Sequence, residues 1–132
     1  MTLSHEDDLP AHKRFPYWFG HIIGIFHTVV QYREAGSQKM EPKHFEFLFV
    51  RWFGRDLSYH GGWKSRRLHR IGFVDGDDDA AFGFLDPREV IHGVHLIPAF
   101  NHGRTTMLLP PSPTAHSLSE KDEDWQYYYV NM

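Results

Sequence analysis

The residues of this chain best suited to chemistry are four aspartates in one short turn and eleven histidines spread along the sequence. The turn DGDDD spans residues 75–79, and its carboxylates could combine with nearby histidines to hold a divalent metal. A small metal-dependent nuclease is therefore one hypothesis. A calcium loop would place a glutamate well beyond its first aspartates, and DGDDDAAFGF lacks that residue. We favour an ordinary acidic turn, and we expect no metal, no cofactor and no catalytic residue.

The histidine spacing does not indicate a metal site either. His92 and His95 would point to opposite faces of a strand. His21 and His27 would share a face, but the strand between them would span about 20 Å, too far for two ligands of one ion. We prefer to interpret the histidines as solvated or core residues.

A basic cluster follows Gly62 and is the candidate for nucleic-acid binding: Lys64, Arg66, Arg67 and Arg70, with Trp63 and His69 beside them. Lysine and arginine contact phosphates, and an indole can stack on bases. Alternation along a strand would divide this cluster between two faces, which favours an ordinary solvated strand face. We therefore expect a protein partner before a nucleic acid.

The composition narrows the classes of protein further. The absence of cysteine excludes disulfides, thiolate nucleophiles and cysteine-ligated metals. The formal net charge of -3 gives no overall attraction to nucleic acid or to an acidic membrane. Because the first residues contain no apolar core of a signal peptide and no run reaches membrane-spanning length, we expect an intracellular protein without membrane association.

The element that must position these side chains is a strand over residues 44–53, within the stretch HFEFLFVRWFGRD. Its late half is apolar on both faces, so it needs cover on both sides, as in a small closed or nearly closed barrel. A long strand over residues 15–33, bent at Gly20 and Gly24, should pair with it antiparallel across the polar segment 34–42. Further strands are predicted over residues 66–74, 81–85, 94–100 and 125–130, with one helical turn from Asp86 to Ile91.

The order of these motifs resembles that of the bromo-adjacent homology (BAH) domain, a β-barrel module of chromatin-associated proteins. PYWFGHIIGIF resembles the opening strand of that family, FVRWFGR its valine, arginine, tryptophan, phenylalanine strand, and WQYYYV its closing strand. FGFLDPREVIHGVHLIP resembles the segment in which a short strand leads through an acidic turn and a helical turn into another strand. The resemblance covers residues 15–132 and implies a small SH3-like, twisted β-barrel, although the loop 101–124 has no counterpart in the family.

A second resemblance concerns origin. VRWFGRD, GWKSRRLHRIGFV, AFGFLDP, VHLIPAF and DWQYYYVNM are similar to the terminal region of transposase-associated proteins of the Kyakuja, Dileera and Zisupton type from mushroom-forming fungi. This resemblance implies a transposon-derived fragment without the catalytic part.

The first resemblance also implies a candidate ligand site. BAH domains that read methylated lysine surround the cation with aromatic side chains. By motif, the cage candidates here are Tyr17, Trp18, Trp52 and Phe84, with Asp86 as an acidic wall. The alternative, which we favour, is that these aromatics fill the core.

Together these observations predict an all-β fold with minor helical turns. We expect a flexible tail over residues 1–14, then a single BAH-like barrel over residues 15–132 with a long loop at 101–124. The predicted function is a non-catalytic binding module, chromatin-reader-like or transposon-derived and nuclear, whose partner is a histone tail or another protein peptide.

Overall fold

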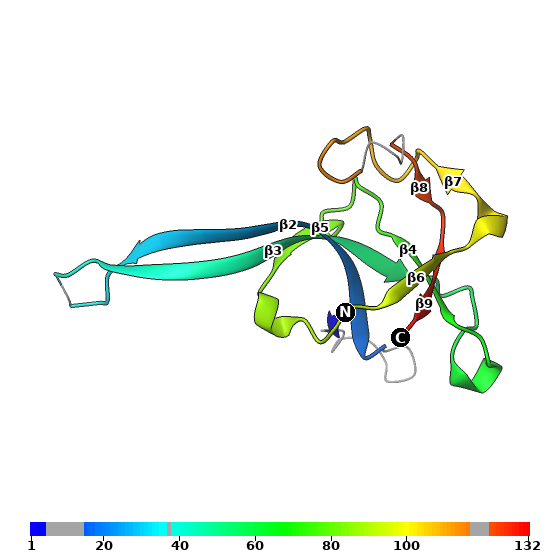
Figure 1. Cartoon of the computed structure of the whole chain (residues 1–132), viewed down its shortest axis with the longest axis horizontal. Helices are drawn as coiled ribbons and strands as arrows, with labels where there is room; N and C mark the ends of the chain where they lie inside the picture. The colour runs from blue at the N-terminus through cyan, green and yellow to red at the C-terminus, as the bar shows by residue number, and fades with distance from the viewer. Residues whose placement is uncertain (5–14, 37, 117–121) are drawn as a thin grey trace.

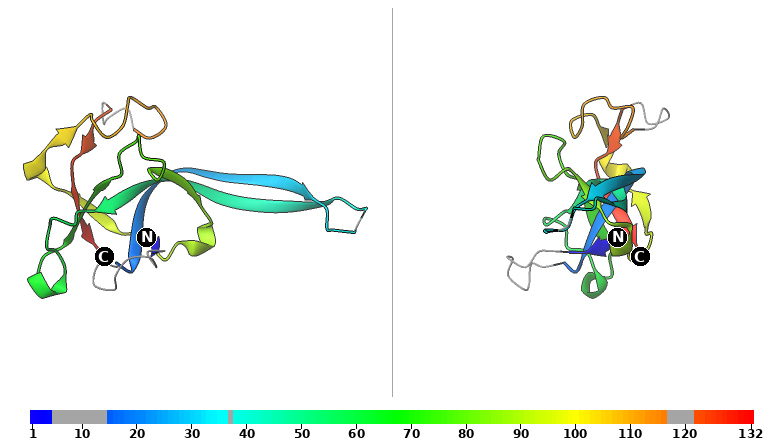
Figure 2. Two further views of the ribbon diagram at one scale, coloured as in Figure 1. Left: turned by 180° about the vertical axis from the view of Figure 1, so that it is seen from behind. Right: turned by 90° about the vertical axis from the view of Figure 1, so that its left-hand side faces the viewer.

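A long antiparallel hairpin dominates the computed structural model, which describes residues 1–4, 15–36, 38–116 and 122–132. Strands β2 (Tyr17–Tyr32) and β3 (Glu41–Arg55) pair along almost their whole length. The register shifts between Ile22 and Gly24, where β2 carries a bulge. The far part of this hairpin, residues 26–32 and 41–47, projects from the body of the molecule, and we call it the arm (Figures 1 and 2).

The remaining strands build the body around the near half of β3. They are β1 (Thr2–Leu3), β4 (His69–Phe73), β5 (Phe82–Leu85), β6 (His95–Pro98) and β9 (Tyr128–Asn131). The strands of the sheet lie in the order β1-β2-β3-β4-β9-β6, and β5 also pairs with β3. Strands β7 (Arg104–Thr105) and β8 (Asp124–Trp125) form a separate pair. Three single 3-10 turns lie between strands: η1 (Trp63–Ser65) between β3 and β4, η2 (Pro87–Glu89) between β5 and β6, and η3 (Phe100–His102) between β6 and β7.

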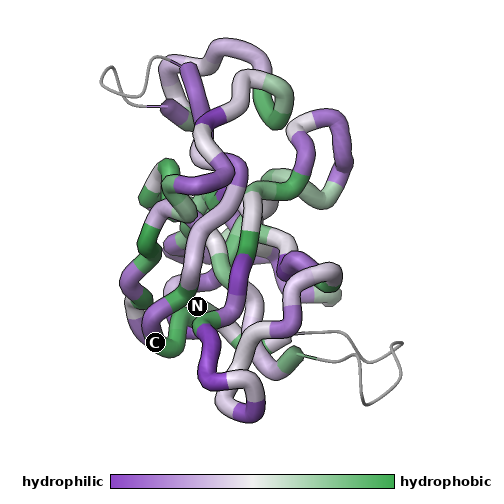
Figure 3. The backbone as a smooth tube through the Cα atoms, turned by 90° about the vertical axis from the view of Figure 1, so that its right-hand side faces the viewer, coloured by the Kyte–Doolittle hydropathy of each residue, from purple (hydrophilic) through white to green (hydrophobic). Residues whose placement is uncertain are grey.

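The predicted all-β class is confirmed, and the predicted barrel is not. The sheet curls around the body, but no sheet closes on itself among the residues that the structure describes. Hydrophilic and hydrophobic segments are interspersed along the chain (Figure 3). No helix in the described part of the chain is long and apolar enough to cross a bilayer.

The core lies inside the body and not in the arm. Phe19, Phe53, Ile71 and Val130 form its buried cluster, and they come from β2, β3, β4 and β9. Phe53 stacks on Phe73 with ring centroids 4.1 Å apart. Both faces of late β3 are therefore covered, as the sequence predicted for this strand.

Several element boundaries differ from the predictions. The strand predicted over residues 66–74 is shorter, because residues 62–67 close into a separate loop before β4 begins. The last predicted strand is divided between β8 and β9, since the N–H of Gln126 donates to the carbonyl of Gly103 instead of joining one ladder. Residues 2–3 of the expected tail form β1 against β2, and residues 5–14 lie outside the described part. Parts of the expected loop 101–124 belong to η3, β7 and β8.

Candidate functional site

An aromatic pocket lies at the start of β2 and the end of β3, away from the arm. Its volume is about 200 Å³, and aromatic side chains make up six of its ten lining residues, which are Phe15, Tyr17, Trp18, Phe19, Trp52, Phe53, Gly54, Arg55, Val74 and Ala80. A cavity of this size suits the end of one side chain and not a whole small-molecule ligand. We call it the tryptophan pocket.

Two of the predicted cage residues form its most distinctive wall. The rings of Trp18 and Trp52 meet edge to face, with centroids 5.9 Å apart and planes inclined at 66°. Glycine is required opposite Trp52, because a Cβ at Gly83 would stand 2.9 Å from the indole Nε1. The sequence thus leaves space for the indole by placing a residue without a side chain on the neighbouring strand β5.

The other predicted cage residues have different surroundings. Tyr17 also lines the pocket, but its ring packs against the core cluster, edge-on to Phe15. Phe84 pairs with Phe49 across β5 and β3, so it points to the face of the sheet opposite that of Gly83 and Trp52. The structure therefore brings Tyr17, Trp18 and Trp52 together and leaves Phe84 outside.

Asp86 does not line the tryptophan pocket. Its carboxylate caps η2 by accepting from the N–H of Arg88, and it forms an ion pair of 2.7 Å with the guanidinium of the same residue. These hydrogen bonds from Arg88 lower the pKa of Asp86 below its usual value. Because its charge is already paired, Asp86 serves the turn in this arrangement.

Charges of both signs border the pocket. Val74 and Ala80, the residues directly before and after the acidic turn 75–79, both line it, so the turn adjoins the pocket. The carboxylates of Asp75 and Asp78 accept backbone N–H groups within the turn, and both residues are exposed to solvent. On the other side the guanidinium of Arg55 lies 5.2 Å from the ring centre of Phe15, so one cation already rests on an aromatic wall.

The metal-site hypothesis finds no assembled centre. Among the described residues, no group of three or more His, Asp or Glu side chains is arranged so that it could hold a metal ion. The acidic turn that we favoured is present, since the N–H of Asp78 donates to the carbonyl of Asp75 at 2.9 Å. The nuclease stays a prediction, and the convergence of carboxylates and a histidine that it needs is not found in the part of the chain that the structure describes.

The predicted nucleic-acid patch divides in an unexpected way. Lys64, Arg66 and Arg67 are exposed around η1, whereas Arg70 is mostly buried in β4. Arg70 forms an ion pair of 2.7 Å with Asp56, and its guanidinium lies 4.3 Å from the ring centre of Tyr59. Arg70 is therefore a structural residue. The other three are not on a strand at all, so strand alternation does not separate them.

An aromatic strip covers one face of the hairpin. It consists of Phe26, Phe45, Phe47, Phe49, Phe82 and Phe84. The ring of Phe47 contacts those of Phe26 and Phe84, each with centroids 5.4 Å apart. Phe84 is nevertheless 71% exposed and Phe26 47%, so the strip is an apolar surface in contact with solvent.

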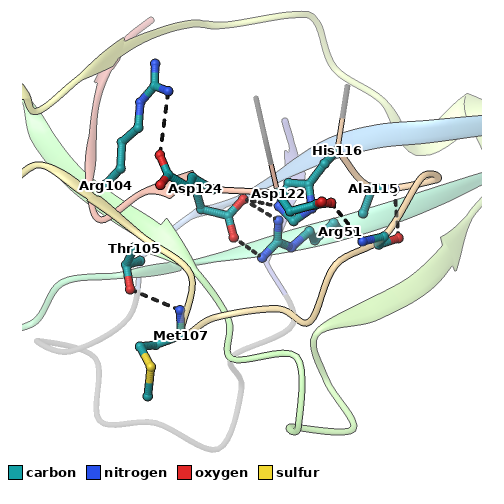
Figure 4. A network of polar contacts seen from close by, with 10 residues as sticks. Arg51, Arg104, Thr105, Met107, Ala115, His116, Asp122 and Asp124 are labelled. Carbon is teal, nitrogen blue, oxygen red and sulfur yellow. Dashed lines mark hydrogen bonds and ion pairs between the residues drawn. The ribbon is translucent and has the colours of Figure 1, made fainter. Parts of the chain in front are cut away.

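A buried polar network that the sequence interpretation missed fixes the loop after β7 to the central strand (Figure 4). Arg51 is fully buried, and its two terminal nitrogens donate to the two oxygens of Asp124 at 2.7 and 2.8 Å. The Nε2 of His116 lies 2.9 Å from Oδ1 of the same carboxylate. The signal in the sequence was an arginine among the apolar residues of late β3, because a charge there must find a partner.

Comparisons with known proteins do not assign this chain to a family. No protein-family model, curated protein or solved structure matches this chain. The similarity to BAH domains and to transposase-associated proteins therefore stays a prediction from the sequence.

Proposed function

We propose that the chain is a non-catalytic binding module that accepts a methylated lysine side chain of an extended protein peptide in the tryptophan pocket. The observation that carries this proposal is the corner formed by Trp18 and Trp52 inside a pocket of about 200 Å³. Ring faces attract cations, and methylation keeps the lysine charge while weakening its hydration. A histone tail as the source of that lysine, a nuclear location and a transposon origin are the finer parts of the same proposal.

The acidic turn supports a cationic ligand. Four carboxylates adjoin the pocket through the residues that flank the turn, and one guanidinium, that of Arg55, opposes them. The local balance is negative, so a cationic peptide is attracted and an anionic one is repelled. The attraction is long-ranged and screened by salt, whereas contact with the indoles is not.

Peptide titration tests the proposal. Synthetic peptides carrying one trimethyllysine, one unmodified lysine or one neutral tert-butyl analogue of trimethyllysine would be titrated against the protein by fluorescence anisotropy. The trimethyllysine peptide should bind most tightly. Replacement of one indole in Trp52→Leu should weaken its binding about tenfold, within the range of a cation–π contact.

The matched control is Trp63→Leu, because Trp63 is 95% exposed and does not line the pocket. This variant should bind the trimethyllysine peptide like the unsubstituted protein. Equal binding of the charged and the neutral peptides would refute the cation–π account without using any variant. Arg55→Gln gives an independent check, because removal of the competing cation should strengthen binding of the methylated peptide.

A further inference from the structure

A small closed loop protrudes between β3 and β4. Gly62 and Arg67 form a β-bridge, in which the N–H of Arg67 donates to the carbonyl of Gly62 at 3.2 Å and the N–H of Gly62 donates back. The 3-10 turn η1 lies between them, and Ser65 donates its N–H and its hydroxyl to the same carbonyl of Gly62. We call residues 62–67 the basic tip. Its backbone is closed by these hydrogen bonds, and such preorganisation lowers the entropy cost of binding.

The basic tip presents an indole to solvent. Trp63 is 95% exposed, whereas Trp18 and Trp52 are partly buried. An aromatic ring that stays in water does not contribute the stabilisation that its burial would give. Trp63 belongs to the hydrogen-bonded turn η1 and not to an irregular segment, so the turn holds the ring out in solvent. A ring presented this way has both faces available for stacking.

Cations surround that indole. Lys64, Arg66 and Arg67 are all exposed, and the ion pairs found in the described part of the chain involve none of them. The nearest acidic residue in the sequence, Asp56, is paired with Arg70. The tip is therefore a positive site on a chain whose net charge is -3.

Two cavities flank the tip. One has a volume of about 410 Å³ and joins Trp63, Arg66 and Arg67 to the apolar side chains of Leu68 and Val130. The other, of about 640 Å³, is lined among others by Lys64, His60 and Arg55, and also by Asp56, whose carboxylate is paired with Arg70. An apolar wall beside an indole suits the faces of a base, and the second cavity suits a phosphate.

From this arrangement we infer that the basic tip is a binding site for single-stranded nucleic acid. Trp63 stacks on an unpaired base, and Lys64, Arg66 and Arg67 contact the phosphates on either side. Stacking on the indole requires a base that is not enclosed in a duplex, which selects single strands over double strands. The inference does not depend on the tryptophan pocket, because none of these four residues lines it, although Arg55 borders both that pocket and the second cavity of the tip.

Fluorescence anisotropy with a labelled short oligothymidylate and its oligouridylate counterpart tests the inference. Binding should weaken with salt, and three phosphate contacts give a log–log slope of about -2. Trp63→Leu should reduce affinity about tenfold and leave that slope unchanged, since a stacking contact releases no counterions. The double variant Arg66→Gln with Arg67→Gln should make the slope shallower than about -1, because two of the three phosphate contacts are removed.

The charge-matched control is Arg33→Gln with Lys43→Gln, which removes one exposed cation directly after β2 and one in the arm and should leave oligonucleotide binding unchanged. Trp52→Leu, the variant of the tryptophan pocket, should also leave it unchanged, so failure of either proposed site is recognised separately. Equal affinity of unsubstituted protein and Trp63→Leu would overturn the inference. Tighter binding to duplex DNA, or binding only to phosphatidylserine vesicles, would overturn it as well.

Discussion

The substitution Asp124→Asn should destabilise this protein more than any change at its surface. The carboxylate of Asp124 is 4% exposed and accepts two hydrogen bonds from the guanidinium of Arg51, which is fully buried. An asparagine keeps the shape but removes the charge, so the arginine stays inside the body without its counter-ion. Removing one partner of a buried ion pair costs about 3–5 kcal/mol.

That cost is large for a domain of this size, whose whole free energy of unfolding is expected to be about 5–15 kcal/mol. Urea unfolding followed by tryptophan fluorescence would measure it as a decrease in the midpoint with an unchanged slope. The structure offers a matched control in Arg88, whose ion pair with Asp86 has the same 2.7 Å separation but lies at the surface. Arg88→Met should leave the midpoint where it is.

A double variant separates the charge from the packing. Arg51→Met together with Asp124→Leu replaces the buried pair by apolar side chains and should recover most of the loss, because no unpaired charge of that pair remains and only the contact of His116 Nε2 with the carboxylate is lost. A midpoint for Asp124→Asn close to that of the unsubstituted protein would refute the reasoning, since it would mean that the arginine finds water or another partner. Failure of the double variant to recover stability would show that shape, and not charge, is what the network contributes.

Three further outcomes follow from the described side chains. Burial tends to raise the pKa of Asp56, but its hydrogen bonds to Ser58 and Arg70 lower that pKa overall. The contribution of Asp56 to the free energy of unfolding is therefore fully present above the usual aspartate pKa of about 3.9. It is lost as the pH falls through the pKa of the folded state. Asp56→Asn should therefore lower the unfolding midpoint at neutral pH and have no effect in strong acid, as urea unfolding across pH would show. Burial, assisted by the charge of Arg55, lowers the pKa of His69, so NMR titration of its ring should give a pKa below about 6.5 that rises only partly in Arg55→Gln. Gly83→Ala should displace the ring of Trp52, reducing binding of the trimethyllysine peptide without affecting oligonucleotide binding, which the two anisotropy titrations would report.

Local patterns were sufficient to predict the strands because most of them depend on neighbouring residues. The apolar run around Val50 and the polar segment after β2 specify a hairpin without long-range information. The Asp-Pro pair before Arg88 specified the turn η2, whose N-cap is Asp86 as predicted. Closure into a barrel was not predictable in this way, because it depends on whether the first and last strands of the sheet meet.

The site residues were harder to predict because they depend on which face of a strand meets which. Phe84 and Trp52 lie on opposite faces of one sheet, and only the register between β3 and β5 decides this. Arg70 looked equivalent to Arg66 and Arg67 in the sequence, yet its neighbour in space is Asp56, fourteen residues earlier. The bridge between Gly62 and Arg67 likewise gathers residues that a continuous strand would have separated.

The projecting arm and the body should open with different free energies of unfolding. Beyond Phe47, whose ring also contacts Phe84 of the body, cross-strand pairs such as Val29 with His44 hold its far end together, and the buried cluster of the body contains no residue from the arm. A lone two-stranded ribbon is marginal in water, so its backbone amides should open and exchange with solvent while the body stays folded. The ribbon can therefore change its sequence, lengthen or shorten without endangering the rest of the molecule.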